Sequence, residues 1–207
     1  MTGRGNSKRA DARQREIYEA AVDLFWEKGY FGTSMRDLAA AVGVQISSLY
    51  YYNGAKQDLL IQIMERTMLD LTRAVRDAVE SAEGIREQLA AAVRAHVLFH
   101  GDHPREAFVT DSELRALEPE NRERMLALRD AHQAIFERLI GEGVAGRLFD
   151  VPDVKLATYA ITTMCTAVGT WYRPDGRLPI GDVAVQYVEM ALRALAYTRR
   201  VSDLPHS

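Results

Sequence analysis

The sequence has a single cysteine and no apolar segment long enough to cross a membrane. Because Cys165 has no second cysteine to pair with, the fold cannot depend on an internal disulfide, and we expect a reducing compartment. The most apolar window, residues 159–172, is interrupted by four threonines and is shorter than the roughly 20 residues that span a bilayer. Residues 1–15 also lack the apolar stretch of a signal peptide. These absences argue against a secreted or membrane-spanning protein and predict a cytoplasmic one with no membrane partner.

An excess of positive charge is also missing, so the whole chain gives no indication of a nucleic-acid partner. The formal net charge is -3 and the isoelectric point is about 6.0. The charge is unevenly distributed, however, because residues 1–15 carry +4 from Asp11 and the basic side chains of Arg4, Lys8, Arg9, Arg13 and Arg15. Since phosphate binding depends on local rather than total charge, a DNA partner is not excluded.

Helical periodicity of apolar residues runs along almost the whole chain, whereas the period-two alternation typical of β-strands is missing. With 207 residues, 47% of them hydrophobic, the chain can form one or two domains with a substantial core. We therefore predict an all-α protein. The first expected helix ends at Gly29, the second runs from a Thr33 or Ser34 cap to Gly43, and the third covers residues 45–52. A long helix starts near Lys56. Later helices are expected around residues 85–97, 125–139, 154–168 and 183–195. Residues 108–117 are expected to be less regular, and residues 141–150 to form a loop.

The second and third expected helices are joined by a tight turn at Gly43, which is typical of a helix-turn-helix. Glycine fits such a turn because it adopts positive φ without strain. Val44 and Leu49 are expected to face the core, and Tyr50 is expected to be buried beside Leu49. The outward positions carry side chains that can bond to base edges or phosphates, namely Gln45, Ser47, Ser48, Tyr51 and Tyr52.

These segments together resemble the DNA-binding sequence of the tetracycline-repressor (TetR) family. The similar residues are TSMRDLA at 33–39, GV at 43–44, LYYY at 49–52 and KQDLL at 56–60. The resemblance implies an N-terminal three-helix helix-turn-helix domain that binds double-stranded DNA, and a C-terminal helical domain that binds a small molecule and forms a homodimer through its last two helices. We predict a flexible basic arm at 1–10, the DNA-binding domain at 11–57, the ligand-binding and dimerisation domain at 58–200, and a flexible tail at 201–207.

The resemblance also implies roles for individual residues at the DNA. The phosphate-contact positions of the family fall on Thr33, Tyr51 and Lys56. Its base-reading positions fall on Gln45, Ser47 and Tyr52. Arg36 is either a solvated surface residue or a further phosphate contact.

The chain departs from the family pattern where the operator is read. The family often has Ser, Gly, His, Phe and Ser in place of Gln45, Ser47, Tyr52, Asn53 and Ala55. Because Ala55 has no side-chain oxygen to cap the helix that starts at Lys56, Asn53 is the expected alternative cap. These differences mean that the operator of this protein cannot be taken from a relative.

The C-terminal half resembles TetR-family members that regulate fatty-acid or steroid catabolism and respond to acyl-CoA thioesters, through residues 112–115, 128–130 and 171–178. An acyl chain or ring favours aromatic and methionine walls, and a CoA phosphate favours arginine. The predicted site for a small hydrophobic effector consists of Phe99, Phe108, Phe136, Met164, Trp171 and Arg173, with Arg177 as an alternative to Arg173. For each aromatic side chain, ordinary core or dimer packing is the alternative role.

Two further patterns could indicate other chemistry. Residues 141–146 read G-x-G-x-x-G, but they follow an expected helix rather than a strand, which argues against a nucleotide loop. His96, His100 and His103, near Asp102, have a spacing compatible with a metal, with a structural or pocket-lining role as the alternative. Since no nucleophile elbow, CxxC motif or paired carboxylates are present, we predict no catalytic residue and no cofactor.

The predicted function is a ligand-responsive repressor that binds a palindromic operator as a dimer. A DNA-binding activator without a small-molecule effector and, less favoured, a metal-dependent enzyme are the alternatives. The sequence leaves open the operator, the regulated genes, the effector, the number of dimers on the operator, and metal binding by the histidines.

Overall fold

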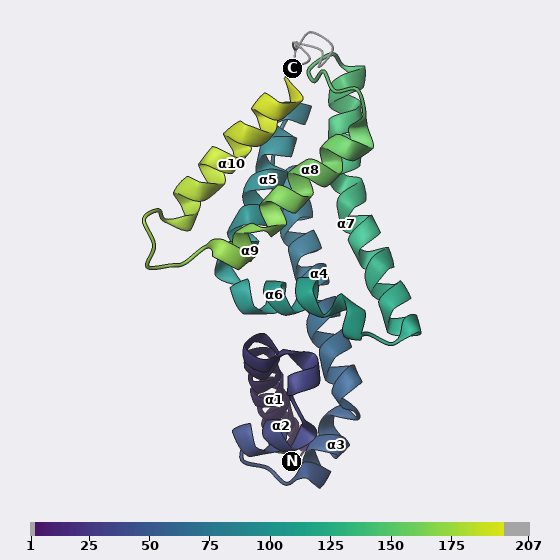
Figure 1. The fold of residues 1–207 in the computed structure, drawn as a ribbon, viewed down its shortest axis with the longest axis vertical. Coiled ribbons are helices and arrows are strands. Elements are labelled where there is room, and N and C mark those ends of the chain that lie inside the picture. The colour runs from purple at the N-terminus through teal and green to yellow at the C-terminus, as the bar shows by residue number, and fades with distance from the viewer. Residues whose placement is uncertain (1–2, 197–207) are drawn as a thin grey trace, which may run out of the picture. The chain divides into compact units, whose positions relative to one another are not determined.

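The structure, a computed structural model, describes residues 3–196 and the side chains of residues 12–196. Helices are the only regular secondary structure in this range, which confirms the all-α prediction (Figure 1). No helix in it combines the length and the apolar character that crossing a membrane requires. The predicted tail at 201–207 lies outside the described residues.

The chain divides into two compact units. Unit 1 contains the residues up to Met68 together with Arg105–Leu128, and unit 2 contains Leu69–Pro104 and the residues from Arg129 on. The division differs from the predicted boundary near residue 57, because part of the C-terminal half belongs to the same unit as the helix-turn-helix. Local packing, and not the order of the segments in the sequence, therefore defines the two units.

Unit 1 contains the N-terminal helices and a segment from the middle of the chain. Its elements are α1 (Gly3–Gly32), α2 (Met35–Ala41), α3 (Ile46–Asn53), the start of α4 (Lys56–Glu80), α6 (Pro104–Ser112), the 3-10 helix η1 (Glu113–Ala116) and the start of α7 (Pro119–Ala145). Helix α1 begins within the segment predicted as a flexible arm and bends at Gly29, where φ is +71°. The core of this unit includes the fully buried side chains of Ile17, Phe25, Leu38, Leu49, Leu59 and Leu60.

The start of α2 and the turn that follows it match their sequence predictions. Ser34 caps α2 in a reciprocal pair with Asp37, in which the Ser34 Oγ accepts from the Asp37 N–H and the Asp37 carboxylate accepts from the Ser34 N–H. The Ser34 hydroxyl also donates to Asp37 Oδ2 at 2.6 Å, and this bond, together with the one from the Ser34 N–H, lowers the pKa of Asp37. Gly43 has φ of +65° and open space where a Cβ atom would stand, so glycine is required there for its backbone conformation and not for space.

Two predictions about α3 and α4 are wrong. Tyr50 is 51% exposed, because it lies one residue further along α3 than Leu49 and the helix therefore turns it away from the core. Asn53 is the last residue of α3 and does not cap α4. Instead the Ala55 N–H donates to Asp58 Oδ2 at 2.7 Å, and the buried Asn53 Oδ1 has no hydrogen-bond partner.

Unit 2 is built from the rest of α4 and α7 together with α5 (Ile85–Asp102), α8 (Val154–Thr166), α9 (Val168–Trp171) and α10 (Ile180–Leu195). Helix α10 packs along α5, and α5 also packs against α8 (Figure 1). Gly101 allows close contact between α5 and α10, because the Ile180 side chain occupies the place where a Cβ atom would stand.

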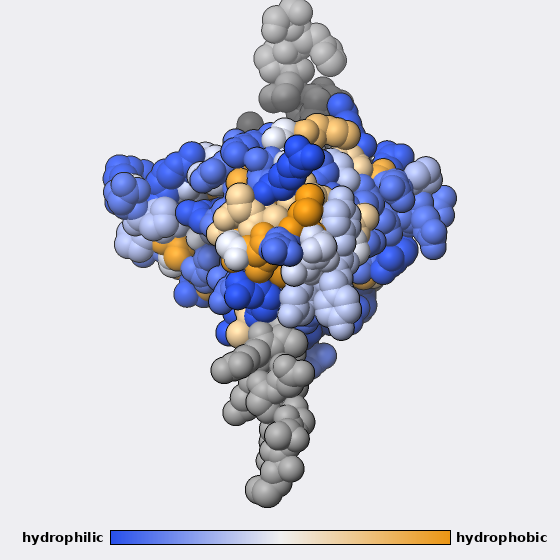
Figure 2. Space-filling view, turned by 90° about the horizontal axis from the view of Figure 1, so that it is seen from below, coloured by the Kyte–Doolittle hydropathy of each residue, from blue (hydrophilic) through white to orange (hydrophobic). Residues whose placement is uncertain are grey.

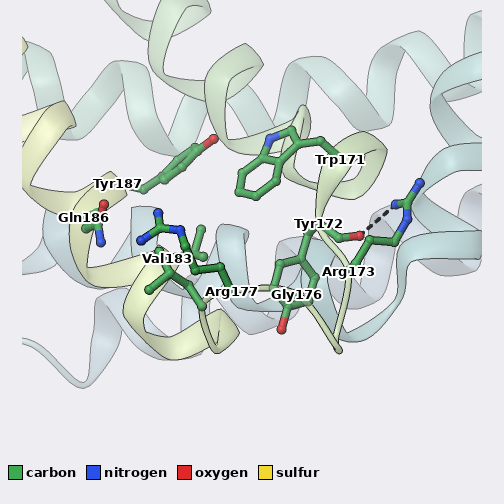
Figure 3. Close-up of a pocket in the computed structure, with 9 residues that line it drawn as sticks. Trp171, Tyr172, Arg173, Gly176, Arg177, Val183, Gln186 and Tyr187 are labelled. Carbon is green, nitrogen blue, oxygen red and sulfur yellow. Dashed lines mark hydrogen bonds between the residues drawn. The ribbon is translucent and has the colours of Figure 1, made fainter.

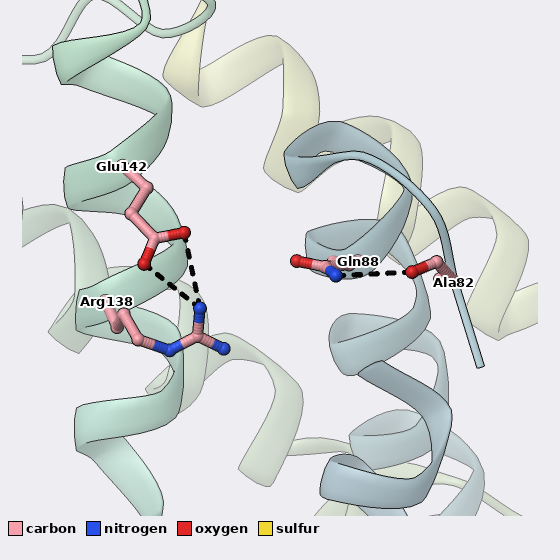
Figure 4. A network of polar contacts seen from close by, with 4 residues as sticks. All are labelled: Ala82, Gln88, Arg138 and Glu142. Carbon is pink, nitrogen blue, oxygen red and sulfur yellow. Dashed lines mark hydrogen bonds and ion pairs between the residues drawn. The ribbon is translucent and has the colours of Figure 1, made fainter. Parts of the chain in front are cut away.

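Polar contacts fix the ends of two unit 2 segments (Figure 4). The Gln88 side chain donates to Ala82 O at 3.2 Å and closes the turn between α4 and α5. Arg138 forms an ion pair with Glu142 one turn further along α7. Such an exposed pair contributes only about 0.3–0.5 kcal/mol.

The loop predicted at residues 141–150 is wrong in its first half, because α7 continues to Ala145. Gly143 is needed inside this helix, since the Phe149 ring lies where its Cβ atom would stand. The Leu148 and Phe149 N–H groups both donate to Gly143 O, which folds the chain back over the helix end. The G-x-G-x-x-G pattern is thus explained by packing at a helix terminus.

Candidate functional site

The surface of α3 presents the polar side chains that the sequence predicts to read DNA. Gln45 is the N-cap residue of α3, and its side chain makes no capping hydrogen bond, which leaves the amide available. Gln45 and Ser47 are exposed, Ser48 and Tyr52 are half-buried, and Tyr51 is 85% exposed. The structure therefore gathers all five predicted residues on one short helix and its cap.

Apolar and aromatic side chains are also exposed on α3 and at the end of α1. Phe31, Ile46, Tyr50 and Tyr51 are exposed, and the ring of Tyr52 stands edge to face against that of Tyr51 at 5.5 Å. Figure 2, which views this end of unit 1 from below, shows hydrophobic residues gathered in the middle of a mainly hydrophilic face. Phe31 is a surface residue that no pattern in the sequence singles out, and Tyr50 is the one that sequence reasoning wrongly predicted to be buried.

Two predicted phosphate contacts, Thr33 and Lys56, form hydrogen bonds within the protein. Thr33 is 2% exposed, and its hydroxyl donates to the backbone oxygens of Leu24 and Gly29 at 3.1 and 2.9 Å. The Lys56 Nζ donates to Tyr30 O at 2.7 Å and to Thr33 O at 2.6 Å. Both side chains thus hold the end of α1, where free carbonyl groups need donors. Burial lowers the pKa of Lys56.

Arg36 is an exposed cation next to the helix-turn-helix. It lies exposed on α2, and within the described part of the chain it forms no hydrogen bond or ion pair. Arg13, by contrast, pairs with Glu16 and donates to Val42 O at 3.1 Å. Of the two roles left open for Arg36, a phosphate contact is therefore sterically available.

A pocket of about 330 Å³ lies between the end of α9 and the start of α10, inside unit 2 (Figure 3). The Trp171 and Tyr187 rings form an aromatic wall, with centroids 6.3 Å apart and planes inclined by 29°. The remaining lining residues are Tyr172, Arg173, Gly176, Arg177, Leu178, Val183 and Gln186. Such a wall suits a flat or apolar group, and an arginine beside it suits an anion.

The two arginines at this pocket differ in orientation. Arg173 Nη1 donates to the neighbouring Tyr172 O at 2.8 Å, and Figure 3 shows its guanidinium pointing away from Trp171. The Arg177 guanidinium lies toward Tyr187 and Trp171, and forms no hydrogen bond or ion pair with any described residue. The alternative that the sequence left open, Arg177 in place of Arg173, is the better placed of the two.

The other predicted effector residues do not line this pocket. Phe108 belongs to unit 1, whereas Phe99, Phe136 and Met164 belong to unit 2. Phe136 is fully buried, with its ring against those of His96 and His132. Phe99 is half-buried beside His103, and Met164 is half-buried on α8. For Phe136 the packing matches the alternative role of a core residue.

A chain of four hydrogen-bonding side chains crosses the core of unit 2. Thr72 Oγ1 lies 3.2 Å from His132 Nδ1, His132 Nε2 lies 3.2 Å from His96 Nδ1, and His96 Nε2 lies 3.1 Å from Thr166 Oγ1. We call these four residues the histidine chain. Each neutral imidazole donates one hydrogen bond and accepts one, so the chain is satisfied in either direction.

Burial keeps these imidazoles neutral. It lowers the pKa of His96 well below its usual range and those of His100 and His132 to about 4. The charges of neighbouring histidines act in the same direction, and Arg76 adds to the effect at His132, whereas the hydrogen bond between His100 and His96 O partly opposes it at His100. His100 stacks on His96 at 4.6 Å, whereas His103 is exposed at the end of α5.

The histidines do not form a metal site in the described residues. No group of three or more His, Cys, Asp or Glu side chains in that range is placed to hold a metal ion. Cys165 is fully buried on α8, and burial raises the pKa of its thiol to about 12. This placement is that of a small core residue.

The three N-terminal helices, with the polar surface of α3, define a helix-turn-helix, and the rest of the described chain is a helical C-terminal domain. The profile of bacterial regulatory proteins of the tetR family matches residues 17–63, and that of the tetracyclin repressor-like C-terminal domain matches residues 82–195. The chain belongs to the TetR family of bacterial regulatory proteins. Membership confirms the resemblance seen in the sequence and supports, at the level of the family, a regulator and not an enzyme.

Individual relatives cover nearly the full chain. It is 28% identical to the HTH-type transcriptional repressor KstR2 of Rhodococcus jostii, over 89% of this chain and 91% of the relative. The crystal structure of PfmR from Thermus thermophilus is 33% identical, with a TM-score of 0.80 over 89% of this chain and 99% of that one. The crystal structure of AibR in complex with isovaleryl coenzyme A and operator DNA is 27% identical, with a TM-score of 0.79 over 86% and 97%.

Proposed function

We propose that this protein is a cytoplasmic transcriptional repressor that binds a palindromic operator as a homodimer and is released by an acyl-CoA thioester. DNA binding is supported by the surface of α3, where Gln45, Ser47 and Tyr51 are exposed and their polar groups make no hydrogen bond to described residues. The effector half is supported by the pocket in unit 2 and by the complex of AibR with isovaleryl coenzyme A and operator DNA.

At the operator, each residue is given a role that its placement permits. Gln45 stands at the N-terminal end of α3, the end that enters the major groove in helix-turn-helix proteins, and its amide can read adenine in a bidentate manner. Ser47, Ser48 and Tyr52 supply hydroxyls for base edges, while Tyr51 and Arg36 reach phosphates. Thr33 and Lys56 support the interface by holding the end of α1.

The experiment that tests base reading is selection of bound duplexes from a random pool. We expect Gln45→Ala to lose its base preference at one position per half-site, without a uniform loss of affinity. The lost discrimination between the right and the wrong base at that position should be about 1–3 kcal/mol. Gln62→Ala, an exposed glutamine on α4, is the matched control and should leave the selected sequence unchanged. An unchanged preference in Gln45→Ala would contradict the assignment.

The effector is tested at the pocket between α9 and α10. We expect acyl-CoA thioesters to bind with the CoA phosphates at Arg177. Arg177→Gln should then weaken binding about tenfold, because it removes one charge-assisted hydrogen bond. Arg173→Gln is the control and should change affinity less than threefold, because this arginine is held by Tyr172 O. Equal losses in both variants, measured by calorimetry with isovaleryl-CoA and palmitoyl-CoA, would refute the placement.

The ligand retained through purification offers a direct observation. Mass spectrometry of native protein is expected to show an acyl-CoA thioester. A protein that carries no ligand, and whose operator affinity no thioester changes, would favour the alternative of an activator without an effector.

A further inference from the structure

Gln57 is a polar side chain that is only 7% exposed, and all its hydrogen-bonding groups are used. Its Nε2 donates to Tyr30 Oη at 3.0 Å and to Ala116 O at 3.1 Å. Its Oε1 accepts from the Glu118 N–H at 3.1 Å. Burial with three partners means that neither a charged nor an apolar side chain can replace it without leaving a polar group unpaired.

The partners of Gln57 come from three places in unit 1. Tyr30 lies at the end of α1, Ala116 is the last residue of η1, and Glu118 directly precedes α7. Tyr30 is also held by Lys56, whose Nζ lies 4.1 Å from the centre of its ring and donates to its carbonyl oxygen. Lys56 further donates to Thr33 O, just before the start of α2. A continuous path of contacts thus leads from the η1–α7 junction to the helix-turn-helix.

Other contacts between the same parts of unit 1 are weaker. Arg105 pairs with Asp23 and lies over the Trp26 ring, but both partners of the ion pair are half exposed. The pair of Arg124 and Glu65 is also partly exposed. Exposed ion pairs contribute little because water screens them, whereas loss of one partner from a buried hydrogen-bonded set leaves unpaired groups. Of these three contacts, the one made by Gln57 is therefore the one whose loss should matter most.

The course of the chain gives this contact a functional meaning. The chain passes between the two units after residues 68, 104 and 128, and the last two crossings bound the segment that Gln57 holds. A change in unit 2 can reach the helix-turn-helix either along α4 or through residues 105–128. Gln57 stands on the first turn of α4 and binds that segment, so both routes meet at its side chain.

We propose that Gln57 is the positioning residue through which effector binding in unit 2 changes operator affinity. Its three hydrogen bonds make the η1–α7 junction and the end of α1 move as one body, so that a displacement of residues 105–128 is passed to α2 and α3. This inference rests on the proposed function, because it requires both an effector and an operator.

The first test measures coupling in the full chain. Operator affinity is measured with and without the thioester that acts best on the unmodified protein in a series from isovaleryl-CoA to palmitoyl-CoA, where coupling is typically about 5–150-fold. The coupling ratio is the operator affinity without the thioester divided by the affinity with it. We expect Gln57→Met, which keeps the size of the side chain and removes its polar atoms, to bring the coupling ratio to within about twofold of one. The affinity for the thioester in the absence of DNA should stay unchanged. Gln62→Met is the control. An unchanged ratio in Gln57→Met would overturn the proposal.

The second test needs no effector. Hydrogen exchange is followed with and without a duplex selected from random sequence. In the unmodified protein we expect the duplex to slow exchange at residues 113–119 as well as in α2 and α3, and in Gln57→Met only in α2 and α3. Equal slowing in both proteins would overturn the inference. If no thioester changes operator affinity, the proposed effector fails, while this measurement still decides the role of Gln57.

A milder variant covers the case in which Gln57→Met does not fold. Tyr30→Phe removes only the hydroxyl that accepts from Gln57 and keeps the ring beside Lys56. We expect it to reduce the coupling ratio part of the way and to weaken the protection at residues 113–119. No change in either measurement would count against the proposal.

Discussion

Lys56 and Arg36 are two cations close to the helix-turn-helix whose side chains are used differently. Lys56 donates to two backbone oxygens at the end of α1, whereas Arg36 is exposed and unpaired among the described residues. Because removal of Lys56 leaves those oxygens without their donor, we expect Lys56→Ala to lower the free energy of unfolding by about 1–3 kcal/mol. Urea denaturation measures this change, and an unaltered midpoint would contradict the structural role.

Arg36 should show the opposite behaviour. Each cation that neutralises a phosphate contributes about one unit to the slope of log affinity against log salt concentration. We expect Arg36→Ala to reduce this slope by about one unit without loss of stability, and Lys56→Ala to leave the slope unchanged. Titrations of a labelled duplex at several salt concentrations distinguish the two residues, and a reversed pattern would restore the phosphate role that the sequence implied for Lys56.

Among the elements, the buried histidines of α5 and α7 make the stability of unit 2 depend on pH. The folded-state pKa values of His100 and His132, at about 4, lie below the unfolded value of about 6.5. Their contribution to stability is therefore complete above pH 6.5 and is lost as the pH falls toward 4. The expected slope is about 1.4 kcal/mol per pH unit for each histidine.

A substitution within the histidine chain tests this dependence. Between pH 6.5 and 4.5, we expect the free energy of unfolding of His132→Gln to change less steeply with pH than that of the unmodified protein, by the equivalent of about one proton. His103→Gln, at an exposed position, is the control and should keep the full slope. Urea denaturation at a series of pH values provides the measurement, and an identical slope in His132→Gln would refute the assignment.

Sequence reasoning was most successful where a local signal determines an element. Gly43 and the Ser34 cap act within a few residues, and the helix expected to start near Lys56 begins at that residue. Sequence reasoning failed where contacts with other segments determine the role of a residue. The need for glycine at position 143 of α7 comes from the Phe149 ring, and the roles of Lys56 and Gln57 depend on Tyr30 and the η1–α7 junction. No local pattern encodes these contacts.

For the whole molecule, the exposed apolar side chains of the last two long helices support the proposed homodimer. They are Leu156 and Tyr159 on α8, and Val185 and Met190 on α10. We expect Val185→Glu to disrupt the dimer, because the interface would bury an unpaired charge. Light scattering should then give the mass of one chain, 23.2 kDa, and operator affinity should fall because the two half-sites are no longer bound together.

A charge placed on an exposed apolar residue of unit 1 is the matched control for this variant. Leu126→Glu on α7 should leave both the dimer mass and the operator affinity unchanged. A Val185→Glu protein that still has twice the mass of one chain would show that this face of α10 is not the interface.

The two tryptophans of the chain fall one in each unit, which provides two optical probes without labelling. Trp26 lies on α1 with the Arg105 guanidinium 5.2 Å from its ring centre, and Trp171 lines the pocket next to α10. With Trp26→Phe, the remaining emission reports on the pocket alone, and with Trp171→Phe it reports on the DNA-binding unit alone. Stopped-flow fluorescence of the two variants can therefore time the arrival of a ligand in one unit and the response of the other.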